Sequence, residues 1–142
     1  MQPALYIFGM TTESPIFKSI TEFTIKRSEW LHGEGGACSK LLRKKDQKKC
    51  CLGFECLARG CDPDLIEGLG TPDDLSDSSH YDEYWKAICD DYDARGEPGV
   101  SLPALQNSLI NINDDPKFDE SVREARITEL FAQRGVKVTF VD

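Results

Sequence analysis

Hydrophobic residues recur along this chain with two different spacings, which predict several helices and a few short strands. Polar and apolar residues alternate over 22–25 and again over 136–140, as they do in a strand with one buried face. Weaker patterns predict a strand over 5–8 and a short helix over 28–33. Apolar residues spaced by three and four, together with capping signals, predict helices over 52–59, 62–67, 81–93, 103–112 and 119–134.

A polar turn at 44–48 lies between two short apolar segments, 39–43 and 49–51, and this order predicts a β-hairpin. We expect the hairpin, near 39–51, to form a small antiparallel sheet with the C-terminal strand 136–141, packed against several helices. Strands and helices do not alternate along the chain as they do in a parallel wound sheet. The predicted fold class is therefore α+β.

The length of 142 residues predicts a single domain, 1–142. Within it we expect an N-terminal extension over 1–20 and an acidic, partly irregular insertion over 70–99. A content of 39 % hydrophobic and 30 % charged residues is typical of a globular protein. No apolar run approaches the roughly 20 residues of a membrane-spanning helix, and the apolar patch at 5–10 lacks the basic flank of a signal peptide. We expect a cytoplasmic location and no membrane partner.

Charge is distributed unevenly along the chain. The net charge is −8 and the isoelectric point is near 4.8, which argues against a general nucleic-acid binder. Residues 38–61 contain seven basic and two acidic residues, whereas residues 62–97 contain twelve acidic and two basic residues. Two interpretations remain open: these are solvated surfaces that attract each other across the fold, or the acidic one is a surface for a partner.

The acidic stretch also carries aromatic residues, and this combination is typical of an interface with a buried anchor and a polar rim. Such a surface would suit a basic partner, for example the groove of another protein that binds nucleic acid. The predicted partner-binding residues are Asp73, Asp74, Asp77, Tyr81, Asp82, Tyr84, Trp85, Asp90, Asp91 and Asp93.

A glycine-rich loop beside basic residues offers an alternative site. Backbone N–H groups of such a loop can hold a phosphate, and nearby cations would add to the attraction. The alternative prediction is a protein that binds or sequesters a small anionic ligand such as a nucleotide, through Gly33, Gly35, Gly36, Lys40, Arg43 and Lys45.

Six cysteines raise the questions of catalysis, metal binding and disulfides. Without an export signal we expect reduced thiols, most of them buried. Cys51, at the start of a predicted helix and next to lysines, would have a lowered pKa and is the candidate nucleophile of a less favoured, cysteine-dependent enzyme. Cys51, Cys56 and Cys61 are spaced by five residues, which would scatter them around a helix rather than gather them on one metal ion. We therefore assign no catalytic residue, no metal and no cofactor.

Several short motifs resemble those of a family of small proteins from tailed bacteriophages and prophages. They are Trp30-Leu31-His32-Gly33-Glu34, Leu41-Leu42, Cys50-Cys51-Leu52-Gly53-Phe54, Asn113-Asp114-Asp115 and Arg123-Glu124-Ala125. The family has no established activity, so the resemblance assigns no catalytic residue. It implies a phage-encoded protein that acts in the bacterial cytoplasm.

Together these patterns favour a binding protein over an enzyme. The main hypothesis is a phage accessory protein that binds and blocks a host factor, with defence systems among the candidate targets. Whether the chain also forms a homo-oligomer is left open by the sequence.

Overall fold

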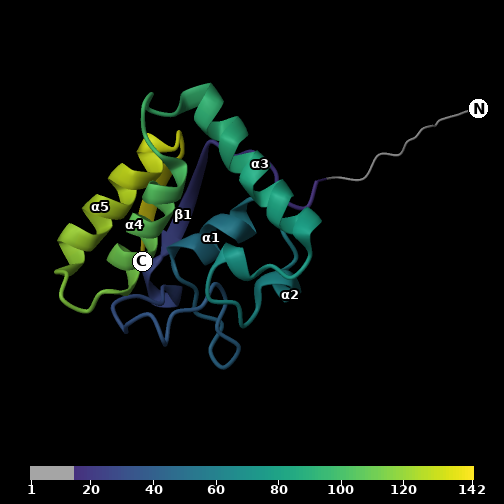
Figure 1. Cartoon of the computed structure of the whole chain (residues 1–142). Helices are drawn as coiled ribbons and strands as arrows, with labels where there is room; N and C mark the ends of the chain where they lie inside the picture. Colours follow the sequence, from purple (N-terminus) through teal and green to yellow (C-terminus); the bar gives the residue numbers. More distant parts are fainter. Residues whose placement is uncertain (1–14) are drawn as a thin grey trace, which may run out of the picture.

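The computed structural model describes residues 15–142, and within them five α-helices pack with a sheet of two strands (Figure 1). Two short 3-10 helices, Arg27–Glu29 and Pro72–Asp74, lie in the connections. The predicted α+β class is confirmed, and the weak strand predicted over 5–8 lies outside the described residues. The elements are β1 (Glu22–Lys26), α1 (Cys51–Ala58), α2 (Pro63–Ile66), α3 (Ser78–Arg95), α4 (Leu102–Asp114), α5 (Glu120–Gln133) and β2 (Lys137–Val141).

The strands β1 and β2 pair in parallel, so the predicted antiparallel sheet is wrong. Phe23 lies opposite Val138, and Ile25 lies opposite Phe140. Alternation of polar and apolar residues identified both strands, but it contains no information about their relative direction. The direction is set by the long connection between them, which contains all five helices.

The segment 39–51 contains no strand of the sheet, although it does fold back on itself. The Arg43 N–H donates to the Lys48 carbonyl, and the Cys50 N–H donates to the Lys40 carbonyl. Its adjacent residues Leu41 and Leu42 are both buried, which a strand with one solvent-exposed face would not allow. The segment is instead packed against α1.

Gly53 makes that close packing possible, because a Cβ atom there would lie 1.8 Å from the Leu41 carbonyl oxygen.

The five helices predicted after residue 51 are all present, with ends close to the expected ones. Asp62 accepts a hydrogen bond from the Asp64 N–H at the start of α2, with Pro63 in the first helical position. Asp77 and Ser101 cap α3 and α4 in the same way. The helix predicted over 28–33 is reduced to the 3-10 turn Arg27–Glu29, because Trp30 is extended and forms a bridge with Lys49.

One face of the sheet is covered by helices and the other faces solvent. In β1, Phe23 and Ile25 are buried, whereas the residues between and beside them are exposed. Helix α1 packs against β1, α5 packs against β2, and α4 contacts both helices. The core therefore lies between the sheet and these three helices, with α3 along one side (Figure 1).

Asn113, at the end of α4, joins parts of the chain that are far apart in the sequence. Its Oδ1 accepts hydrogen bonds from Trp30 Nε1 at 2.9 Å and from the Cys51 N–H at 3.0 Å. Its Nδ2 donates to the Leu31 carbonyl and to Asp114 Oδ1. The side-chain amide thus accepts two hydrogen bonds and donates two, all within the protein.

We expect Asn113→Ala to lower the free energy of unfolding by about 3 kcal/mol, because it leaves two buried N–H donors without an acceptor. Urea unfolding followed by circular dichroism measures the change. The control is Asn111→Ala, which removes the same side chain from an exposed position of α4. Similar losses for the two variants would contradict this role of Asn113.

Candidate functional site

The structure divides the ten predicted partner-binding residues into groups with different roles. Asp74 Oδ2 accepts hydrogen bonds from the Gly70 and Thr71 N–H groups, and Asp77 caps α3. These two carboxylates are thus engaged in local structure. The others lie in the core, on the outer side of α3, or on the wall of a pocket.

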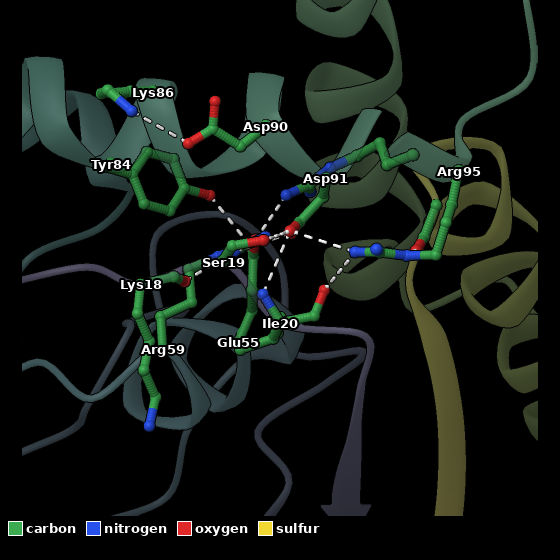
Figure 2. Close-up of polar contacts among 12 residues, drawn as sticks. Lys18, Ser19, Ile20, Glu55, Arg59, Tyr84, Lys86, Asp90, Asp91 and Arg95 are labelled. Carbon is green, nitrogen blue, oxygen red and sulfur yellow. Dashed lines mark hydrogen bonds and ion pairs between the residues drawn. The ribbon is translucent and has the colours of Figure 1, made fainter. Parts of the chain in front are cut away.

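Tyr84 and Asp91 have no solvent-exposed area, so they do not belong to the surface on which the sequence placed them. Both belong to a buried ionic cluster, which we define as Glu55, Arg59, Tyr84, Asp91, Gln106 and Arg134. Figure 2 shows the first four of these residues. The acidic stretch around Asp91 predicts a solvent-exposed side chain, but Asp91 lies on the inner side of α3 and is therefore in the core.

Glu55 lies at the centre of the buried ionic cluster. Its Oε2 accepts from Arg59 Nε at 2.8 Å and from Arg134 Nη2, and its Oε1 accepts from the Tyr84 hydroxyl at 3.0 Å. Gln106 completes this side of the cluster, since its Nε2 donates to the Tyr84 hydroxyl and its Oε1 accepts from Arg134.

Asp91 forms the other anionic centre. Arg59 Nη1 lies 2.8 Å from Asp91 Oδ2. Asp91 Oδ1 accepts from the Ile20 N–H at 3.0 Å, from the Ser19 hydroxyl, and from Arg95 Nη2 at 3.3 Å (Figure 2). Asp91 thus ties α3 to α1 and to the segment that leads into β1.

The buried charges balance, because two carboxylates face two fully buried guanidinium groups. Burial acts to raise the pKa of Glu55, but Arg134 and Arg59 outweigh it and hold that pKa below its ordinary value. The Glu55 carboxylate is therefore ionised at neutral pH, and both of its oxygens accept hydrogen bonds. Such a cluster fixes the packing of helices, and its acceptors are not available to a substrate.

The face of α3 next to the buried one forms one wall of a surface pocket. Tyr81, Trp85 and Cys89 are spaced by four residues and so lie on one face of the helix. The pocket has a volume of about 440 Å³. We call it the α3–α4 pocket, and its lining consists of Asp73, Tyr81, Trp85, Cys89, Leu102, Pro103, Gln106 and Asn107.

The lining of the α3–α4 pocket is aromatic and contains a carboxylate but no lysine or arginine. Helix α4 itself contains no basic residue. Asp82 and Asp93 are exposed on α3, 100° and 120° around the helix from Tyr81, on the side towards the pocket. The electrostatic potential of this face therefore favours a cation.

Asp90 lies on the other side of α3, where Lys86 Nζ donates to its Oδ2 at 3.0 Å. It lines a different hollow, together with Lys18 and Glu83. Asp90 thus provides a carboxylate on the same helix that is remote from the aromatic face.

The glycine-rich loop is held by the protein itself. The Gly33 N–H donates to the Asn113 carbonyl, and the Gly35 N–H donates to the Asp114 carbonyl, both at the end of α4. Gly33 has a φ of 68°, and a Cβ atom there would lie 3.0 Å from the Arg123 guanidinium. These glycines thus serve a tight turn against α4, and two of the N–H groups expected to hold a phosphate are already used.

The cations beside the loop are also divided. The Arg43 guanidinium forms ion pairs with Asp46 and Glu34, and Lys40 is half-buried. Lys45 and Gly36 are exposed. The loop and its neighbours are therefore not gathered into one basic pocket.

All six cysteines are free thiols, and four of them are buried, as expected. Burial raises the pKa of the Cys51 thiol well above its ordinary value, and it raises the pKa of Cys50 to about 11. This is the opposite of the lowered pKa predicted for Cys51 at the start of α1. Cys38 and Cys89 are the exposed thiols. Among residues 15–142, no group of three or more histidine, cysteine, aspartate or glutamate residues is placed to hold a metal ion.

Sequence reasoning missed two features of this region. The α4 wall of the pocket, with Leu102, Pro103 and Asn107, had no signal beyond the proline at the helix start. The buried ionic cluster did have one, because Glu55 and Arg59 are an i, i+4 charge pair at the end of an otherwise apolar helix.

Comparisons with known proteins give no relative. No family model, no curated protein and no solved structure matches this chain. In the part of the chain that the structure describes, no helix has the length and apolar character needed to cross a membrane.

We expect Asp91→Asn to lower the free energy of unfolding by roughly 3–5 kcal/mol, because it leaves the buried Arg59 and Arg134 charges with Glu55 as their one buried counter-charge. The adjacent Asp90→Asn makes the same chemical change on the exposed side of α3, and we expect an effect within about 0.5 kcal/mol. Urea unfolding of both variants tests the difference. Equal effects would show that Asp91 does not hold α3 in place.

Proposed function

We propose that this protein is a binding protein that blocks a host factor by covering a basic surface on it. The observation that carries the proposal is the α3–α4 pocket, where two aromatic side chains and a carboxylate line one concave surface that contains no basic residue. Aromatic residues in a pocket with a polar rim are typical of the energetic centre of a protein interface.

The chemistry of the face selects the class of partner. Tyr81, with 37 % of its surface exposed, is one of the few large hydrophobic side chains that the described residues leave open to solvent. The carboxylate of Asp73 lines the same pocket, and Asp82 and Asp93 are exposed further around α3. A positively charged protein surface would bury the aromatic rings and bring its cations to the rim, and the net charge of −8 would accelerate its approach.

The resemblance to small tailed-phage proteins supplies the setting of this proposal. A phage-encoded protein would meet its partner in the bacterial cytoplasm, where host proteins that bind nucleic acid carry basic grooves. A component of a defence system would be such a partner. In this proposal the protein acts by occupying the groove and needs no cofactor.

The two alternatives have less support. The small anionic ligand site would need the loop N–H groups of Gly33 and Gly35, which already donate to α4. A cysteine-dependent enzyme would need a reactive thiolate, and the Cys51 thiol is buried with a raised pKa.

The test is capture from a bacterial lysate at low salt with immobilised full-length protein and three variants. Wild type and Asp90→Asn should both retain one discrete host protein, which elutes as the salt concentration rises. Tyr81→Ser and Asp73→Asn should recover at least tenfold less of it, since a loss of 1.4 kcal/mol in binding is tenfold in affinity. The purified host protein should also lose its own nucleic-acid binding when wild type is added.

Tyr81→Ser changes an exposed side chain, so its unfolding transition should match that of wild type, which makes a loss of capture interpretable. If Tyr81→Ser retains the same host protein as well as Asp90→Asn does, the pocket is not the binding surface.

A further inference from the structure

We infer that the α3–α4 pocket receives a single arginine side chain of the partner, an inference that rests on the proposed function. At about 440 Å³ the pocket lies at the small end of the 300–1,000 Å³ range of ligand pockets. It thus has room for one long side chain rather than for a folded segment. The three features below determine which side chain.

The first feature is the pair of aromatic rings one helical turn apart. Tyr81 and Trp85 line the same pocket, so a side chain that enters it lies beside two aromatic rings, whose faces attract a cation. Arginine is planar and weakly hydrated and stacks on such faces, whereas the compact lysine ammonium is strongly hydrated and loses more on leaving water.

The second feature is the indole N–H of Trp85, which has no partner inside the described part of the protein. Trp30 is fixed by its hydrogen bond to Asn113, but the buried Trp85 Nε1 has no hydrogen-bond partner within residues 15–142. The Trp85 ring has an edge-on contact with Tyr84, at 5.8 Å between the centroids. The Trp85 indole is therefore held by packing against the core and not by a hydrogen bond, so its N–H signal reports on changes in the pocket.

The third feature is the carboxylate of Asp73. Asp74 and Asp77 accept hydrogen bonds from backbone N–H groups at the starts of their helices. Asp73 lines the pocket, and no cation within residues 15–142 forms an ion pair with it. Asn107 adds an exposed amide to the same lining. The five N–H donors of a guanidinium can use both groups at once, which the three donors of an ammonium do less well.

The protein already holds one of its own surface arginines with this combination of groups. Arg27 lies 6.0 Å from the centroid of the Phe140 ring and bonds to the carboxylates of Glu124 and Asp142. The α3–α4 pocket presents the same elements, aromatic rings and a carboxylate, without an internal cation.

The test uses the ¹⁵N-labelled full-length protein and short peptides. The probe is acetyl-Gly-Gly-Arg-Gly-Gly-amide, and its matched control replaces arginine by citrulline, which has nearly the same shape and no charge. The arginine peptide should shift the indole N–H signal of Trp85 in a saturable way, and it should leave the signal of Trp30 in place. Trp85→Phe assigns the two signals. The citrulline peptide should bind at least tenfold more weakly.

Two variants of equal charge test the position of the site. Asp73→Asn should weaken the arginine peptide severalfold, and Asp90→Asn should not. Equal binding of the arginine and citrulline peptides, or tighter binding of a norleucine peptide, would overturn the inference. So would equal binding of a lysine peptide, because the planar guanidinium would then not be recognised.

The result can be separated from a failure of the proposed function. If the arginine peptide causes no shift while Tyr81→Ser still loses the captured host protein, the inference is wrong and the proposed function stands. If the peptide binds as expected but no host protein is captured in a Tyr81-dependent way, the proposed function fails, although the pocket still selects arginine.

Discussion

The structure depends on buried ion pairs that join the end of α1 to α3. Glu55 and Asp91 are fully buried carboxylates, and Arg59 lies between them, bonded to one and paired with the other (Figure 2). Removing any one of these groups would leave the buried charges unbalanced, which is among the costliest defects in a protein. The cluster therefore favours the one orientation of α3 about its axis that directs Tyr84 and Asp91 into the core, and other orientations would break its ion pairs.

That rotation determines what the surface presents. With Tyr84 and Asp91 directed inwards, helical geometry places Tyr81, Trp85 and Cys89 on the neighbouring face. The other wall of the pocket is set by the same cluster, because Gln106 of α4 reaches inwards to Tyr84 and Arg134 while it also lines the α3–α4 pocket. The candidate binding surface is thus built directly on the polar part of the core.

The helices were predictable because their signals are local. Asp62, Asp77 and Ser101 cap the helices that follow them, and apolar spacing defined the inner faces. The direction of the sheet was not predictable, since residue alternation is the same in parallel and antiparallel strands. The sequence also could not show that Asp91 is buried and Asp90 exposed, because their positions on α3 follow from partners such as Arg59 that come from another helix.

The short motifs around Trp30, Cys51, Asn113 and Arg123 meet in space. The Asn113 side chain accepts hydrogen bonds from the Trp30 indole N–H and from the Cys51 backbone N–H. Arg123 donates to the carbonyls of Ile112, Asn113 and Asp115 at the end of α4. These residues hold loops and helices together, which explains the motif as a framework of the fold. The candidate site lies elsewhere, on α3 and α4, where the amino-acid pattern signalled only aromatic residues among acids.

The most direct test of the central claim, that a cation of the partner sits in the α3–α4 pocket, is competition for the captured host protein. The arginine peptide and its citrulline counterpart are added in turn to the complex, at one fixed ionic strength so that screening is the same for both. A pocket that holds an arginine of the partner predicts release by the arginine peptide at concentrations where the citrulline peptide releases none. Equal release by both peptides, or none by either, would contradict it.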